Sequence, residues 1–237
     1  MTAIRFTPFI AFLCCCSVML GGCTTNGVKP DKADGETVGN VAADEQYIKG
    51  NRALSAGDYR SAIKYFRLQE RRHPQHPATQ QAQLETIYAY FKHNAPAAAV
   101  RAANAFIERY PDQQNLPYVY YLRGLALYES GIEATMGEGA GASKTARQSY
   151  RYFVALLKNF PESQYAADAK ERMAVLRDVL ASYETKRAAK ALAAGQYATA
   201  TVRAKYVLEN YQNTSAIEEA LSVLTQAYEA LGVGAQQ

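Results

Sequence analysis

The residues that most often bind metals or transfer protons are few in this sequence and do not cluster. There are three histidines: His73, His76 and His93. Two of them lie in the segment His73-Pro74-Gln75-His76-Pro77, where the prolines favour a turn and no third metal ligand is suggested. We therefore expect a solvated turn here and predict no metal site.

Sequence motifs of catalytic sites are missing as well. The chain contains no Gly-x-Ser-x-Gly, no His-Glu-x-x-His and no acid/base pair with a recognisable spacing. The glycine-rich stretch from Gly137 to Gly141 lacks the Lys-Ser/Thr pair of a phosphate-binding loop and follows no predicted strand. These observations predict that the protein is not an enzyme and uses no cofactor.

One cysteine does indicate covalent chemistry. An apolar run of thirteen residues follows Arg5 and ends in Leu20-Gly-Gly-Cys23, which resembles a bacterial lipobox. We predict a signal peptide over residues 1–22 and lipidation of Cys23. An ordinary signal peptide with an incidental cysteine is the alternative. The other three cysteines lie inside the signal peptide, so the mature chain would hold no disulfide.

The residues after Cys23 indicate where the lipid would hold the protein. In bacterial lipoproteins an aspartate at the next position signals retention in the inner membrane, so Thr24 implies the periplasmic face of the outer membrane. Residues 24–43 are polar and rich in Gly, Asp, Thr and Ala. We expect residues 23–43 to form a lipidated, flexible tether.

A repeated helical unit organises the rest of the chain. The segment from Gly57 to Phe66, closed by Pro74, has the Gly-x-Tyr turn and the Ala-x3-Phe…Pro spacing of a tetratricopeptide (TPR) repeat. Similar unit ends, each following an aromatic residue, occur later in the chain at positions 111, 161 and 212. A small residue lies twelve positions before each of the four unit ends: Ala62, Ala99, Ser149 and Ala200. Small residues at one phase let neighbouring helices approach closely. The pattern predicts an all-α, TPR-like α-solenoid of about four helix pairs plus a final helix.

The unit ends are unevenly spaced, so the units in the second half of the chain must contain longer helices or insertions. The first gap is 37 residues, whereas the next two are 50 and 51. The segment Ala166–Ala194 has no Gly or Pro and is predicted to be one long helix. Residues 129–145 are rich in Gly and Ala, and we expect a disordered insertion there. It would separate N-terminal units over 44–128 from C-terminal units over 146–237.

Charge and aromatic content constrain the partners. The net charge of +4 comes from basic residues interleaved with acidic ones, which argues against nucleic-acid binding. There are 18 tyrosines and no tryptophan. If Gly50 and Gly124 mark the small positions of the first helices of their units, a concave groove would be lined by tyrosines and one asparagine: Tyr47, Asn51, Tyr118, Tyr121 and Tyr128. Such a groove suits a peptide, although packing within the core is the alternative for each tyrosine.

Several segments together resemble the BamD (ComL) family of outer-membrane β-barrel assembly lipoproteins. They are the lipobox ending at Cys23, the segment QLETIYAYFK over 83–92, the segment YVYYLRG over 118–124, and Ser163-Gln-Tyr165 with Asp168-Ala-Lys. The resemblance spans residues 44 to about 231 and is more specific than a generic TPR pattern.

The resemblance implies a scaffold that binds the POTRA region of BamA, other Bam lipoproteins and unfolded outer-membrane proteins. By position, Arg203 matches the basic residue of the family that meets BamA. Tyr47, Asn51 and Tyr88 fall in the groove attributed to substrates. An arginine is suited to bidentate pairing with a carboxylate, although a solvated Arg203 on an amphipathic helix is the alternative. A second hypothesis for the whole chain is another TPR lipoprotein, such as a pilotin for a secretin.

Overall fold

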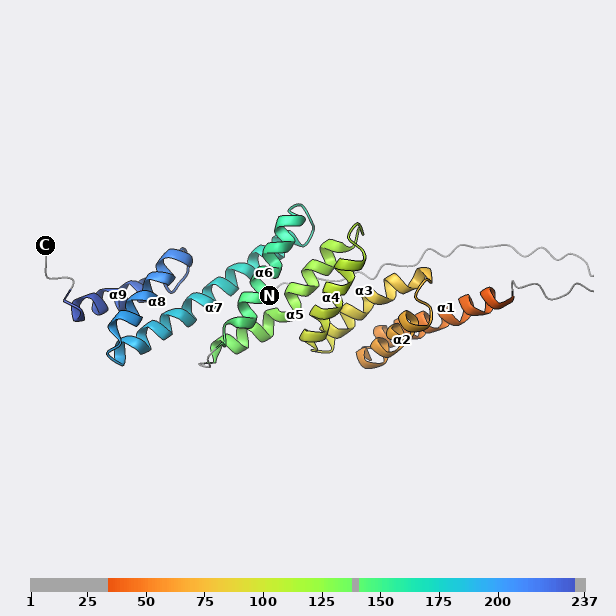
Figure 1. Cartoon of the computed structure of the whole chain (residues 1–237), viewed down its shortest axis with the longest axis horizontal. Helices are drawn as coiled ribbons and strands as arrows, with labels where there is room; N and C mark the ends of the chain where they lie inside the picture. Colours follow the sequence, from red (N-terminus) through yellow and green to blue (C-terminus); the bar gives the residue numbers. More distant parts are fainter. Residues whose placement is uncertain (1–33, 138–140, 233–237) are drawn as a thin grey trace, which may run out of the picture.

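The computed structural model describes residues 34–137 and 141–232, with side chains from residue 41 onward. Within these ranges the chain forms nine α-helices and no strand. The helices are α1 (Asp34–Ser55), α2 (Tyr59–Arg72), α3 (Pro77–Lys92), α4 (Pro96–Arg109), α5 (Leu116–Met136), α6 (Lys144–Asn159), α7 (Ala166–Ala193), α8 (Tyr197–Asn210) and α9 (Ile217–Ala230). The helices follow one another along a single axis from α1 to α9 (Figure 1). The predicted solenoid of four helix pairs and a final helix is confirmed.

The turns inside the first and fourth pairs are made by glycine. Gly57 joins α1 to α2 with φ of 74°, and Gly195 joins α7 to α8 with φ of 70°. Other residues adopt this backbone region only with strain, which explains the Gly-x-Tyr motif at both places. Asp58 then caps α2, because its carboxylate accepts a hydrogen bond from the Ser61 N–H at 3.0 Å.

The small residues counted from the sequence lie where helices approach most closely. Ala62, Ala99, Ser149 and Ala200 are all 0% exposed. Facing them, the glycines of the first helices leave room for an aromatic ring. A Cβ atom added to Gly124 would lie 2.5 Å from the Phe153 ring, and one added to Gly50 would lie 2.4 Å from the Phe66 ring. The interpretation of both glycines as the small positions of their helices is confirmed.

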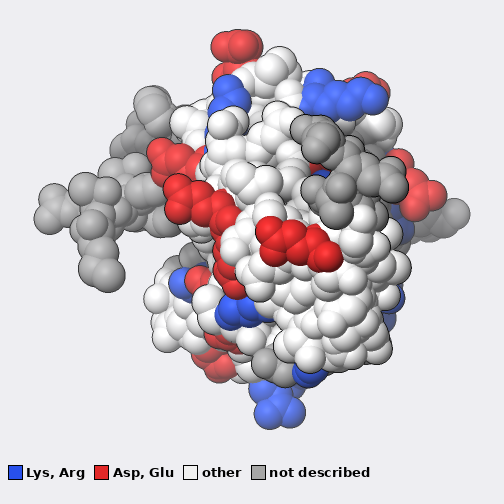
Figure 2. Space-filling view, turned by 90° about the vertical axis from the view of Figure 1, so that its left-hand side faces the viewer, with Lys and Arg blue, Asp and Glu red and all other residues white. Residues whose placement is uncertain are grey.

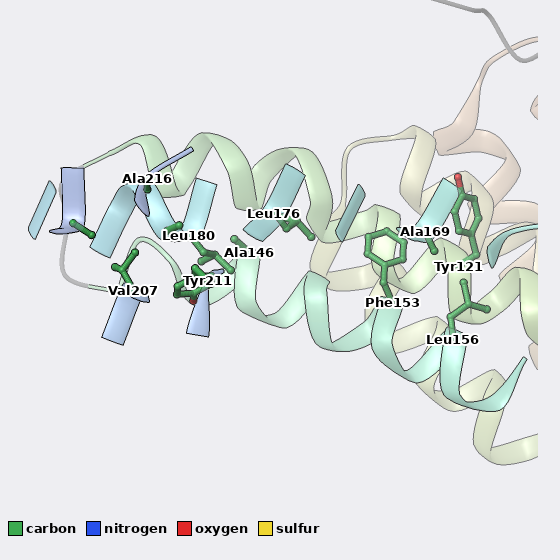
Figure 3. Packing of buried hydrophobic residues seen from close by; sticks show 12 residues of the cluster. Tyr121, Ala146, Phe153, Leu156, Ala169, Leu176, Leu180, Val207, Tyr211 and Ala216 are labelled. Carbon is green, nitrogen blue, oxygen red and sulfur yellow. The ribbon is translucent and has the colours of Figure 1, made fainter. Parts of the chain in front are cut away.

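The long helix α7 takes part in two hydrophobic clusters. It contributes Ala169, Leu176 and Leu180 to the largest hydrophobic cluster, which also receives residues from α5, α6 and α8 (Figure 3). Its last turns contribute Ala188 and Ala191 to a second cluster with α8 and α9. A single helix of 28 residues, about 42 Å long, therefore belongs to two packing layers.

Two expected flexible segments are partly helical, which corrects the sequence interpretation. The expected tether 23–43 overlaps α1, which begins at Asp34; residues 23–33, including Cys23, lie outside the described residues. The expected insertion 129–145 is shorter than predicted, because α5 continues to Met136 and α6 begins at Lys144. Gly131 explains the second case: a Cβ there would lie 2.9 Å from the Ala146 backbone, so the extra turns of α5 pack closely on α6. Glycine serves close packing at this position rather than flexibility.

The end of the solenoid that α9 closes carries charges of both signs. In the view onto this end, acidic and basic side chains are scattered over a surface made mainly of other residues (Figure 2). Glu218 and Glu219 lie in the first turn of α9. No described helix is long and apolar enough to cross a membrane.

Candidate functional site

The tyrosines singled out from the sequence lie next to one another along the first helices of the repeats. Tyr47 lies on α1, Tyr88 on α3, and Tyr118 and Tyr121 on α5. We call these four residues, together with Tyr165 at the start of α7, the tyrosine row. The Tyr118 ring lies 5.6 Å from the Tyr165 ring, and the Tyr121 ring stacks on Tyr165 at 4.9 Å. The structure therefore brings Tyr165 against two residues of α5 that are 47 and 44 positions away in the chain.

The N-terminal part of the row contains a carboxylate that the sequence analysis missed. Burial raises the pKa of the Tyr47 and Tyr118 hydroxyls, and the nearby charge of Glu85 raises both further. Asn51 hydrogen-bonds to Tyr47, as its place one turn along α1 suggests. Glu85 itself accepts a hydrogen bond from Gln81 Nε2 at 2.7 Å, and no ion pair to it is found among the described residues. Burial raises the pKa of Glu85, opposed in part by this hydrogen bond.

The C-terminal part of the row is held by an ion pair. The hydroxyl of Tyr121 donates to Asp168, and Asp168 also pairs with Arg172 Nε at 2.6 Å. The Arg172 guanidinium in turn covers the Tyr128 ring at 4.8 Å. Burial, followed by the bond to Asp168, raises the pKa of Tyr121 to about 12. Because Tyr121 is only 8% exposed, its main role in this structure is packing.

These properties suit binding better than catalysis. The raised pKa values keep Tyr47, Tyr118 and Tyr121 protonated near neutral pH, so their hydroxyls act as hydrogen-bond donors and not as bases. Rings, hydroxyl donors and one carboxylate acceptor are the groups that hold an extended peptide.

Replacing Glu85 with glutamine should stabilise the protein at neutral pH. The folded-state pKa of Glu85 is raised, so the charged form costs stability above that pKa, and the cost disappears as the pH falls toward the unfolded value of 4.5. A glutamine keeps an oxygen for Gln81 and removes the buried charge. We expect the melting temperature at pH 7 to rise by a few degrees, and the difference from the wild type to vanish near pH 4.5.

Thermal unfolding followed by circular dichroism at several pH values measures this. The exposed Glu129 provides the control, because Glu129→Gln should change the melting temperature little at any pH. A Glu85→Gln protein that is less stable than the wild type at pH 7 would contradict the assigned cost of the charge.

Arg203 lies at the other end of the molecule and is already paired inside it. Its Nη1 lies 2.9 Å from Glu184 Oε2, and the other carboxylate oxygen of Glu184 lies 2.8 Å from Arg147 Nη2. Arg147 also donates to the hydroxyls of Tyr206 and Tyr211 at 3.1 and 3.0 Å. We call Arg147, Glu184 and Arg203 the arginine–glutamate clamp.

The clamp leaves part of its surface open to a partner. The side chains of Arg147 and Arg203 are 30% and 28% exposed, whereas Glu184 is buried. Beside them, Val202 is 69% exposed and Tyr206 is 37% exposed. Together these residues line a surface hollow of about 550 Å³. No sequence pattern points to Glu184, because its two partners are 37 and 19 positions away.

The histidine turn has a structural use. His76 caps α3, where its Nδ1 accepts a hydrogen bond from the Ala78 N–H at 3.2 Å. Its side chain is 11% exposed, so the expectation of a fully solvated turn is wrong for His76. Across residues 34–137 and 141–232, the structure contains no group of three or more potential metal ligands.

Comparison with known proteins gives a family and several relatives. The model of the family YfiO, outer membrane lipoprotein, matches residues 40–237. The outer membrane protein assembly factor BamD of Neisseria meningitidis serogroup A is 34% identical over 218 residues, which cover 90% of this chain and 81% of that protein. The BamD of Xylella fastidiosa strain 9a5c is 31% identical over 236 residues, covering 96% and 78% of the two chains. That of Pasteurella multocida is 31% identical over 194 residues, covering 80% and 75%.

Proposed function

The chain belongs to the YfiO outer membrane lipoprotein family, and from this we propose that it is a noncatalytic scaffold of the β-barrel assembly (Bam) machinery. The resemblance to BamD that the sequence motifs indicated is confirmed. The observation that carries the proposal is the family match, because it runs through almost all of the described helices. In the proposed role the protein binds BamA and unfolded outer-membrane proteins and promotes their insertion.

Substrate binding is proposed for the tyrosine row. Support comes from the continuity of the row across α1, α3 and α5, and from Glu85, whose charge lowers stability without a cationic partner among the described residues. Groups whose charge costs stability are often found at functional sites. An incoming peptide would supply N–H groups or a basic side chain to Glu85, and rings or aliphatic groups to Tyr88 and Tyr118.

Binding of the POTRA region of BamA is proposed for the surface around Arg203. Support comes from Val202, an exposed apolar side chain next to the partly exposed Arg203 and the exposed Tyr206. Arginine and tyrosine next to an apolar anchor form the composition of energetically important interface centres. Because Glu184 already holds Arg203, a carboxylate of BamA would be a second partner for the guanidinium.

The anchor is proposed from the sequence alone, because Cys23 lies outside the described residues. A lipid on Cys23 would attach the protein to the periplasmic face of the outer membrane and would be its one covalent addition. In this arrangement α1 begins about ten residues after the anchor.

A photo-crosslinking map tests both binding proposals at once. A photoreactive amino acid placed at Tyr88 should crosslink to an unfolded outer-membrane protein, and one placed at Val202 should crosslink to BamA. Position 202 is better than position 203, because it leaves the pair between Arg203 and Glu184 intact. Val175, an exposed valine on α7, provides the matched control and should give neither product.

The outcome separates the proposed partners. Crosslinks from position 202 to a secretin subunit instead of BamA would favour the pilotin hypothesis. Substrate crosslinks that are equally strong at positions 88 and 175 would refute a specific substrate site at the tyrosine row.

A further inference from the structure

A pocket on another side of the molecule has no part in the proposed function. It lies between α2, α3 and α4 and has a volume of about 390 Å³. On α3 it is lined by Gln83 and Tyr90, each two positions away from Glu85 or Tyr88 of the tyrosine region. Two helical positions correspond to a rotation of about 200°, so the pocket and the tyrosine row face opposite sides of α3.

The pocket has an excess of positive charge. Arg67, Arg101 and Arg109 contribute three guanidinium groups, and Glu70 contributes one carboxylate. We call this site the arginine pocket. Glu70 is used internally: it accepts from Gln83 Nε2 at 2.6 Å and pairs with Arg109 at 3.4 Å. Its single charge therefore leaves a net charge of about +2 at the pocket.

Two of the three guanidinium groups remain available to a ligand. Arg67 donates to the neutral hydroxyl of Tyr90 at 3.4 Å, which leaves its charge uncompensated. For Arg101 no hydrogen bond or ion pair is found among the described residues, and its side chain is exposed. Two arginines that form no ion pair at one opening can donate hydrogen bonds to a carboxylate.

The floor of the pocket is apolar, which restricts the ligand further. It is formed by Ala98, Ala102 and Phe106, of which Phe106 is 3% exposed. A ligand that fills the pocket therefore needs an apolar group beside its negative charge. A volume of about 390 Å³ suits one or two amino-acid side chains.

The arginine pocket lies between α2 and α4, the second helices of the first two repeats, and the corresponding space between α4 and α6 is filled differently. There Arg123 of α5 inserts its guanidinium between the rings of Tyr120 and Tyr152, at 4.7 and 4.4 Å. Its Nη1 also donates to Asn104 at 3.0 Å. Cation–π contacts and a hydrogen bond thus occupy the arginine inside the fold. Exposed arginines without an ion pair are therefore a property of the arginine pocket and not a general consequence of the repeat.

We propose that the arginine pocket binds an acidic peptide segment of a partner protein, with a glutamate or aspartate next to an aliphatic residue. The carboxylate pairs with Arg101 and Arg67, and the aliphatic side chain lies on Ala102 and Phe106. A lipid headgroup is a poorer match, because the charges line a hollow between helices with an apolar floor and do not project toward a flat surface. The site is independent of the tyrosine row and of the arginine–glutamate clamp.

Fluorescence anisotropy with the full-length protein in mild detergent tests the proposal. The probe is a fluorescein-labelled ten-residue peptide of alternating Glu and Leu, and the control peptide replaces every Glu with Gln. The acidic peptide should bind, with weaker binding at higher salt. Arg101→Glu should raise the dissociation constant about tenfold or more, and Arg101→Gln should have a smaller effect.

The matched control is Arg72→Glu, which changes the net charge equally. Arg72 is exposed on α2 but does not line the pocket, so binding of the acidic peptide should stay within about twofold of the wild type. Circular dichroism of all variants should show unchanged helix content, because both arginines lie on the surface.

Three results would overturn the proposal. The first is an equal loss of binding in Arg72→Glu, which would indicate unspecific attraction by net charge. The second is equal binding of the Gln peptide. The third is displacement of the acidic peptide by glycerophosphoglycerol, a soluble phospholipid headgroup, at equal concentration, which would assign the pocket to a headgroup.

Discussion

Replacing Phe153 with alanine should destabilise the protein by about 3–5 kcal/mol. The Phe153 side chain is 0% exposed and lies in the space left by Gly124. It also contacts the rings of Tyr121 and Tyr128, at centroid distances of 6.2 and 6.3 Å. Removing the ring leaves a cavity between α5 and α6 that neither helix backbone can close without moving. Urea unfolding followed by circular dichroism measures the loss.

The adjacent residue provides the control. Val154 is 41% exposed, so Val154→Ala should change the free energy of unfolding by no more than about 0.5 kcal/mol. Because solenoid stability is approximately a sum over neighbouring interfaces, we also expect Phe153→Ala to broaden the transition by uncoupling the two ends. A Phe153→Ala protein as stable as Val154→Ala would mean that this ring is not the contact that joins α5 and α6.

Replacing Glu184 with alanine should cost about 3 kcal/mol, near the lower end for breaking a buried ion pair. The change leaves Arg147 and Arg203 facing each other without the carboxylate that lies between them. Partial exposure of both arginines lets water relieve some of the repulsion. The same measurement of urea unfolding applies, with Glu45→Ala as the control. Glu45 forms an exposed pair with Lys49, so its loss should cost less than about 1 kcal/mol.

The double variant Glu184→Ala with Arg147→Met distinguishes charge from packing. If the cost of Glu184→Ala comes from uncompensated charge, removing one arginine should restore part of the stability; no recovery would contradict this origin. The clamp also makes a charge reversal at Arg203 difficult to interpret as a test of BamA binding. Arg203→Glu would place a second carboxylate against Glu184, so a loss of BamA binding in that variant could result from local unfolding. For this reason we prefer Val202 for mapping the proposed interface.

Two errors of the sequence interpretation concern segments whose composition allows two structures. Glycines and alanines over 129–145 are as compatible with disorder as with two closely packed helices. Gly131 supports the second structure, because its missing Cβ admits the Ala146 backbone. The same ambiguity applies to residues 34–43, which form the first turns of α1. At Gly131 the partner surface, and not the local sequence, selects the helix.

The sequence by itself determined the repeat, the phase of its helices and the family. Small residues such as Ala62 and Ala200 must recur at one phase because helices can approach only there, and left-handed turns at Gly57 and Gly195 require glycine. Only the tertiary structure decided which charges meet. Glu184 with its two arginines, Glu85 beside Tyr118, and the unpaired Arg101 depend on contacts between helices far apart in the chain. Such electrostatic contacts act between any residues brought within a few ångströms and leave no period in the sequence.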